Sequence, residues 1–329
     1  MDYKNLVFAG GGVKGIAYLG SLEVLDNKDI LKNIKRVAGT SAGSITACIV
    51  SMYDNYSDIK AVADKIDYSK VPSDEEHYET KKTSKGFINE LEHHVLENQS
   101  VDNIFRLLKE YGWYSSSYVY GFLRQSIEDR FKQNKKEYTF RDFKENNMKD
   151  LYVIGTDMVN RCTRVFSYEE TPDIEVAKAV RISMSIPLYF ESEISDYKNL
   201  KNIVFSDGGV MRNYPVNLFD KEEYEINSKL DATGRNEETL GFNLHSQKEP
   251  KEISNIVEYI ENLFDALLSV QTDMLMNNEE DMKRTININT FNIKSTDFNI
   301  KVNDEKYNKL FNSGKESTQK YLSNVHVMN

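Results

Sequence analysis

The stretch Gly39-Thr40-Ser41-Ala42-Gly43 stands where a short apolar run ends and a helical pattern begins. Residues 34–38 alternate between apolar and polar side chains, which predicts a β-strand, and the apolar residues of 45–52 recur at helical spacing. Glycines on both sides of a serine permit the close backbone approach that a sharp strand-to-helix corner requires. A G-x-S-x-G nucleophile elbow has this geometry and holds a serine hydroxyl above the sheet. A tight turn whose serine only caps the helix fits the pentapeptide as well.

A glycine-rich loop precedes this corner. The apolar run Leu6–Ala9 is typical of a buried parallel strand, and it ends in Gly10-Gly11-Gly12-Val13-Lys14-Gly15. A helical pattern follows from Ile16, so the order is strand, loop, helix, strand, elbow, helix. This order predicts a right-handed crossover between parallel strands. Both loops then emerge at the carboxyl edge of the sheet, where open α/β sheets carry their chemistry.

The glycine loop has three interpretations. A dinucleotide site would need an acidic residue at the end of the second strand, and the elbow occupies that position. A phosphate-binding P-loop would need Lys followed by Ser or Thr after the last glycine, but Ile16-Ala17 follows. The third interpretation is an oxyanion hole, in which the amides of Gly11 and Gly12 face the charge that develops during acyl transfer. We favour the oxyanion hole and expect Lys14 to be an ordinary surface lysine at its rim.

A carboxylate follows a third apolar strand. Residues 203–205 lead into Ser206-Asp207-Gly208-Gly209, where two glycines turn the chain sharply. An Asp-Gly turn is common, but here the aspartate is expected at the carboxyl edge of the sheet, near the serine. Asp207 is therefore a candidate catalytic carboxylate.

A serine nucleophile needs a base. The five histidines are His77, His93, His94, His245 and His326, and only His245, just past a predicted strand, is a candidate. The alternative is a dyad in which Asp207 accepts the serine proton, which requires a poorly solvated carboxylate of raised basicity. We favour the dyad because Asp207 lies in a recognisable motif and no histidine does.

Taken in order, Gly10–Gly15, Gly39–Gly43 and Asp207-Gly208-Gly209 resemble the patatin-like phospholipase family. The resemblance extends over nearly the whole chain, although Lys14 stands where the family often has arginine. It implies a Ser41–Asp207 dyad, an oxyanion hole in the first glycine loop and a three-layer α/β/α fold with a mostly parallel central sheet. It also implies calcium-independent hydrolysis of acyl esters in phospholipids or lysophospholipids. Some family members stay inactive until a partner or nucleotide binds, and the residues leave open whether this chain needs such an activator.

Composition narrows the classes of partner. Lys plus Arg number 42 and Asp plus Glu 52, a net charge of −10, which argues against nucleic-acid binding. Two cysteines without metal-ligand spacing predict neither a disulfide framework nor a zinc site, and we expect no metal or other cofactor. We expect no signal peptide, because the apolar run near the N-terminus is too short, and no transmembrane segment. A cytoplasmic protein that touches membranes peripherally, through apolar contacts or a partner, is the resulting expectation.

The rest of the chain is expected to complete one patatin-like domain over residues 1–329. A charged insertion at about 72–148 is predicted to be mostly helical, and a charged tail from about 297 to be helical too. Further strands are predicted at 151–156, 163–168, 240–244 and 285–291, and helices at 174–185 and 254–276.

Three hypotheses follow. The first is a lipid acyl hydrolase that works through an acyl-serine intermediate. The second is a binding or scaffolding protein that keeps the fold without turnover, which labelling by a fluorophosphonate probe would distinguish. The third is a nucleotide-binding oxidoreductase, which cofactor titration would test and which lacks its ribose-binding acid.

Overall fold

The computed structural model describes residues 2–72, 101–197, 200–227, 229–246, 250 and 252–328. The strands are β1 (Asn5–Phe8), β2 (Arg36–Thr40), β3 (Gly112–Tyr114), β4 (Asp150–Asp157), β5 (Cys162–Phe166), β6 (Leu188–Phe190), β7 (Glu193–Ile194), β8 (Val204–Asp207), β9 (Thr239–His245) and β10 (Thr285–Asn289). The α-helices are α1 (Ile16–Asn27), α2 (Ala42–Met52), α3 (Tyr56–Ala63), α5 (Val101–Glu110), α6 (Ser117–Phe131), α7 (Phe140–Glu145), α8 (Val176–Ser183), α9 (Ile256–Met276), α10 (Glu279–Lys283) and α11 (Glu305–Met328). Short 3-10 helices are η1 (Gly12–Gly15), η2 (Leu31–Asn33), η3 (Tyr68–Lys70), η4 (Gly208–Val210), η5 (Val216–Phe219) and η6 (Glu222–Tyr224).

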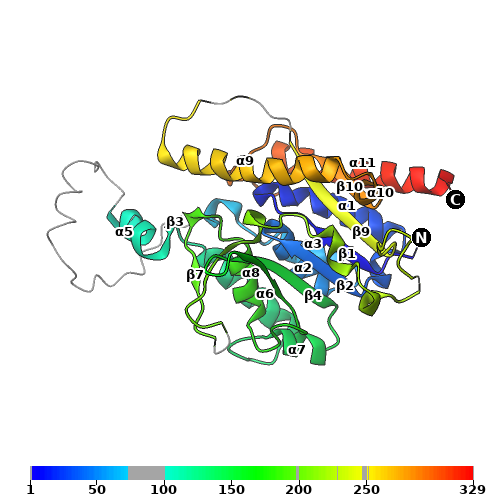
Figure 1. Cartoon of the computed structure of the whole chain (residues 1–329), viewed down its shortest axis with the longest axis horizontal. Helices are drawn as coiled ribbons and strands as arrows, with labels where there is room; N and C mark the ends of the chain where they lie inside the picture. The colour runs from blue at the N-terminus through cyan, green and yellow to red at the C-terminus, as the bar shows by residue number, and fades with distance from the viewer. Residues whose placement is uncertain are drawn as a thin grey trace.

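A mostly parallel sheet forms the centre of the molecule (Figure 1). Its strand order is β10-β9-β1-β2-β4-β8-β7, with β5 paired to β4, and the first five strands of this order are parallel to one another. The predicted crossover between β1 and β2 is therefore present, and Phe8 pairs with Gly39 at the end of both strands. The expected three-layer fold with a mostly parallel sheet is confirmed.

The direction of β8 differs from the expectation that Asp207 ends a further strand running with the others. This strand is antiparallel to β4, with Asp207 opposite Gly155. Thr40, the last residue of β2, pairs with Ile154, while β5 occupies the other edge of β4 at both positions. β2 and β8 therefore lie end to end along one edge of β4. Their last residues meet because the two strands run toward each other.

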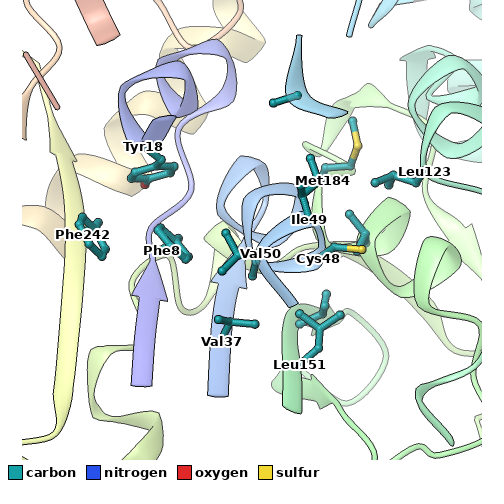
Figure 2. Packing of buried hydrophobic residues seen from close by; sticks show 14 of the residues in the cluster. Phe8, Tyr18, Val37, Cys48, Ile49, Val50, Leu123, Leu151, Met184 and Phe242 are labelled. Carbon is teal, nitrogen blue, oxygen red and sulfur yellow. The ribbon is translucent and has the colours of Figure 1, made fainter. Parts of the chain in front are cut away.

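Alternating side chains give the sheet two apolar faces. Phe8, Val37 and Phe242 lie on one face and belong to a core cluster that also contains buried residues of α1, α2 and α8 (Figure 2). The rings of Phe8 and Phe242 are stacked with centroids 5.0 Å apart. The opposite face is covered by the short helices η5 and η6, whose Leu218, Phe219 and Tyr224 cover Val7, Ala38, Tyr152 and Ile154. The third layer is thus made of 3-10 turns, which keeps it thin.

The described part of the expected insertion consists of α5, β3, α6 and α7. The sequence pattern also predicts a helix of this insertion at Phe87–Leu96, and these residues lie outside the described ones. β3 is a short strand that the sequence pattern did not predict, and it pairs in parallel with β6. Buried Glu191, just after β6, accepts hydrogen bonds from the Ser115 hydroxyl and the Ser116 amide, at 2.8 and 3.0 Å. The carboxylate thereby joins the insertion to the segment that follows α8.

Candidate active site

Ser41 stands at the junction of β2 and α2 in a strained conformation. Its φ of 53° and ψ of −125° lie in a region that non-glycine residues rarely adopt, and such strain is concentrated at functional sites. Its amide donates to the Ser183 hydroxyl at 2.9 Å, and Ser183 in turn donates to the carbonyl of Ile154 at 2.5 Å. α8 therefore holds the turn through one buried hydroxyl. The turn has the shape that a nucleophile elbow requires.

The flanking glycines are needed for space. A Cβ on Gly39 would overlap the backbone of Gly43, and a Cβ on Gly43 would overlap the carbonyl oxygens of Phe8 and Ala9. The strand, the elbow and the helix therefore approach one another more closely than any side chain would allow. Thr40 ties this corner to the segment after β8, because its hydroxyl donates to the carbonyl of Arg212 at 3.0 Å.

Asp207 is fully buried beside the elbow. The amide of Gly209 donates to its Oδ1 at 2.6 Å, and its own amide donates to the carbonyl of Ser185 at 2.8 Å. Thr156 fixes the residue from β4 by donating to its carbonyl oxygen at 2.8 Å. These bonds fix the main chain and one carboxylate oxygen, so that the carboxyl group has little freedom to turn.

Burial raises the pKa of Asp207 to about 7. The Gly209 amide and the Ser41 hydroxyl oppose this shift, because hydrogen bonds to a carboxylate stabilise its charged form. The second carboxyl oxygen, Oδ2, is buried and has no hydrogen-bond partner among the described residues. The Ser41 hydroxyl is thus close enough to act on the carboxyl group but does not form a hydrogen bond of full geometry with Oδ2. A carboxyl group in this state is a base poised near neutral pH.

The glycine loop lies against the elbow. A Cβ on Gly10 would lie 3.0 Å from Cβ of Ser41, and Gly15 packs on Ala42. Gly12 has a φ of 57°, and a Cβ there would overlap the Ser295 carbonyl, so the position requires glycine.

Two amides of this loop are available for a ligand. The Gly10 amide donates to Asn213 O at 3.1 Å and the Val13 amide to Ser295 O at 2.9 Å. Within the described residues, the amides of Gly11 and Gly12 have no hydrogen-bond partner of this kind. The role of these two amides as donors to an oxyanion stays a prediction.

A cleft of about 450 Å³ opens beside the glycine loop, and neither Ser41 nor Asp207 lines it. Its volume is suited to a small-molecule site. Gly10, Gly11 and Lys14 form one wall, with Asn213 beside them, and α9 forms another. Lys14 thus borders the cleft. A second, mainly apolar cavity of about 70 Å³ lies between α1, α2 and α3, bordered by Gly12 and Ala42.

α9 holds the motif around Asp207 from outside. The Gln271 side chain donates to Gly209 O and accepts from the Asn213 amide, both at 2.7 Å. Asn213 also approaches the glycine loop, since its side-chain amide donates to Gly10 O at 3.4 Å. Gln271 was not predictable from the sequence, because a lone glutamine in a helical pattern carries no local signal of such a role.

The histidines lie elsewhere or outside the described side chains. His245 borders the cleft, but its interactions are with Asn287 and the main chain of Ile288, in the edge strand β10. Burial lowers the pKa of this imidazole. β9 and β1 separate the ring's partners from β2, so the described structure gives Ser41 no histidine in the role of a base.

Neither a metal-binding group nor a membrane-spanning helix is found among the described residues. Among them, no three His, Cys, Asp or Glu side chains are grouped so that they could hold a metal ion. No described helix combines the length and the apolar character that crossing a bilayer demands.

The sequence of this chain is similar to a known protein family and to individual proteins. The family model for patatin-like phospholipase matches residues 6–220, which contain all three motifs. Uncharacterized protein YqhO of Bacillus subtilis is 30% identical over 278 residues, which cover 82% of this chain and 81% of that protein. The probable lipid hydrolase 463L of Invertebrate iridescent virus 6 is 27% identical over 229 residues, which cover 69% of this chain and 67% of that protein.

A solved structure shares the fold. VipD from Legionella pneumophila is similar to 98% of this chain and 67% of its own, with a TM-score of 0.58 and 19% sequence identity. At this identity the likeness concerns the fold alone.

Proposed function

The chain belongs to the patatin-like phospholipase family, and on that premise we propose that it is a serine esterase that hydrolyses fatty-acyl esters of phospholipids or lysophospholipids. Family membership and the lipid hydrolase among its relatives support a lipid hydrolase function. The observation that carries the finer proposal is the buried Asp207 carboxyl, with a pKa of about 7, beside a serine at a strained strand-to-helix turn.

In the proposed mechanism, the Ser41 hydroxyl attacks the ester carbonyl carbon while Asp207 accepts its proton. The amides of Gly11 and Gly12 donate to the oxyanion of the tetrahedral intermediate. Collapse of that intermediate breaks the bond to the alcohol, which leaves with the proton from Asp207. Water then attacks the acyl-serine, Asp207 accepts a proton again, and the fatty acid departs as the serine is restored. No step needs calcium.

The surroundings of the dyad support an amphiphilic substrate. The cleft beside Gly10 and Gly11 has a mixed lining in which charged side chains such as Lys14 and Glu261 stand beside apolar ones, whereas the cavity beside Gly12 and Ala42 is mainly apolar. A lipid bound across the glycine loop can place its polar part in the cleft and its apolar part in the apolar cavity. We also propose that the protein contacts lipid surfaces peripherally, and that an activating partner or ligand can act on the buried site.

The test compares purified wild type with Ser41→Ala and Asp207→Asn in hydrolysis of phosphatidylcholine and lysophosphatidylcholine in micelles. We expect each substitution to lower the rate by at least about a thousandfold, while the circular dichroism spectrum stays that of a folded protein. A fluorophosphonate probe should label wild type at residue 41 and leave Ser41→Ala unlabelled. Retained lipid hydrolysis in Ser41→Ala would refute the proposal, and labelling without turnover would favour a binding protein that keeps the fold.

A further inference from the structure

The exposed face of α9 is apolar, the reverse of an ordinary surface helix, whose outward face is polar. Six large apolar side chains repeat every three or four residues along it and are between 42% and 69% exposed: Ile256, Tyr259, Leu263, Leu267, Val270 and Met274. We call these six residues the outer face of α9. Figure 1 shows the helix, in gold, along the outside of the molecule.

The other sides of the helix already have partners. Ile260, Phe264 and Leu275 are buried against the core. Glu261 and Asp265 turn toward the cleft, where they interact with Lys294 and the Ser295 hydroxyl at 3.4 and 3.2 Å. Three of the helix's four carboxylates, those of Glu261, Asp265 and Asp273, thus border the cleft and not the outer face, and within the described chain nothing covers the outer face.

The outer face is continuous with the cleft. Met276, at the end of the helix, borders the cleft and is also 48% exposed. The same helix fixes the Asp207 motif through Gln271. Any surface that contacts the outer face would therefore lie at the opening of the cleft beside the glycine loop.

We propose that the outer face of α9 is the surface by which this protein docks on a lipid layer without net charge. The inference rests on the proposed function, which requires the cleft to meet lipids in an assembly. Charge selects the kind of layer, because the helix carries four carboxylates, no lysine and no arginine, and the chain has a net charge of −10. Such a helix binds by apolar insertion and gains nothing from anionic headgroups. A second copy seated there would instead obstruct the rim of its partner's cleft.

The experiment measures binding to vesicles of diether phosphatidylcholine, which has no acyl ester and so reports binding without hydrolysis. The variants are Leu263→Asp, Leu263→Asp/Val270→Asp and the control Ile226→Asp. Ile226 is 44% exposed against 46% for Leu263, and its amide donates to the Glu238 carboxylate near the amino ends of β1 and β9, at the opposite edge of the sheet. The control thus adds the same charge at a matched exposure, away from α9.

We expect wild type and Ile226→Asp to co-sediment equally with these vesicles. Leu263→Asp should bind about tenfold more weakly, which corresponds to about 1.4 kcal/mol, and the double variant more weakly still. Replacing a third of the lipid by anionic phosphatidylglycerol should not strengthen binding. Hydrolysis of the soluble ester p-nitrophenyl butyrate should be unchanged in all variants, whereas hydrolysis of vesicle phosphatidylcholine should fall with binding.

Each result has one meaning. Equal vesicle binding by wild type and the double variant would overturn the docking surface. So would a wild-type dimer in sedimentation equilibrium that the double variant splits, because a second copy would then cover the face. Vesicle binding that depends on the outer face, without any ester hydrolysis by wild type, would support the surface and refute the proposed enzyme.

Discussion

A single carboxyl group decides what chemistry the site can perform. Asp207 and Asp157 are both fully buried, near the ends of neighbouring strands, yet their environments differ. For Asp157, burial acts to raise the pKa, but hydrogen bonds from Asn160 and the paired Arg164 hold it below the ordinary value. Among the described residues no cation acts on Asp207, so burial dominates and its pKa is raised to about 7. Asp207 is thus suited to proton transfer, and Asp157 to a permanent charge.

The first prediction concerns the pH dependence of the rate. Only ionised Asp207 can accept the serine proton, so kcat/KM for a soluble ester should rise with pH and reach half its plateau near pH 7. Initial rates between pH 5 and 9 provide the measurement. Asp157→Asn should keep this profile, because the Asp157 carboxylate is engaged by Arg164. A rate that is flat across this range would exclude Asp207 as the base.

The second prediction concerns stability, which should change with pH in the opposite sense. A carboxyl group whose pKa is higher in the folded than in the unfolded state binds its proton more tightly when folded. Its cost to stability therefore grows as pH rises from about 4 to about 7. A shift from 3.8 to about 7 sets a ceiling of roughly 4 kcal/mol. Asp207→Asn should thus be more stable than wild type in urea at pH 8, with a smaller difference at pH 5; a constant difference would contradict the shift.

At the scale of elements, two helices support the segments that carry Ser41 and Asp207. α8 supports the elbow through Ser183, and α9 supports the Asp-Gly-Gly turn through Gln271. Both supports are side-chain hydrogen bonds to backbone groups, so they fix the loops without contacting the reacting atoms. The relative placement of Ser41 and Asp207 thus depends on helix packing as well as on the motifs themselves.

The third prediction tests the support from α9. Gln271→Ala removes one donor to Gly209 O and one acceptor from the Asn213 amide, which should destabilise the protein by about 1–3 kcal/mol. Because the turn holding Asp207 is loosened, kcat should fall about tenfold with KM nearly unchanged. Steady-state kinetics and urea unfolding measure both effects. Gln125→Ala is the control, since among the described residues the Gln125 side chain bonds to Asp129 one turn later in α6 and does not line the cleft, and an equal loss of kcat there would contradict the positioning role.

At the scale of the whole molecule, a helix near the N-terminus, α1, packs against the C-terminal helix, α11. α1 and α11 cross closely because glycines lie at the contact: a Cβ on Gly20 would overlap Phe311 O, and one on Gly314 would overlap Ala17 O. The Ser21 hydroxyl donates to Gly314 O at 3.1 Å across the same contact. The C-terminal helix is therefore packed against the helix that follows the glycine loop. We accordingly propose that residues 1–329 unfold as one domain.

The fourth prediction concerns this crossing. Gly314→Val should destabilise the protein by roughly 2–3 kcal/mol, because the backbones must separate to admit the side chain. Gly121→Ala, in α6 with open space around it, should raise stability by up to about 1 kcal/mol. Urea denaturation followed by tryptophan fluorescence and by circular dichroism measures both. Coincident transitions are expected of one domain, whereas two separate transitions, or a neutral Gly314→Val, would contradict the close packing.

The sequence by itself located the three loops and the order of the first strands and helices. These features are local: glycines at a corner, apolar runs of strand length and helical periodicity are visible without tertiary contacts. The proposed roles of Ser41, Asp207 and the glycine-loop amides remain predictions that the experiments above address. What the sequence could predict was therefore which segments carry the chemistry.

The tertiary structure alone decided how those segments meet. The direction of β8 depends on pairing with β4, which lies about fifty residues earlier, and an apolar run pairs equally well in either direction. The pattern predicted α9 as an amphipathic helix, but periodicity does not say which face turns outward. The Asp207 pKa likewise depends on groups from β4, the elbow and the Gly209 turn assembled around one carboxyl. Long-range pairing and burial are properties of the assembled chain, and therefore no single stretch of sequence encodes them.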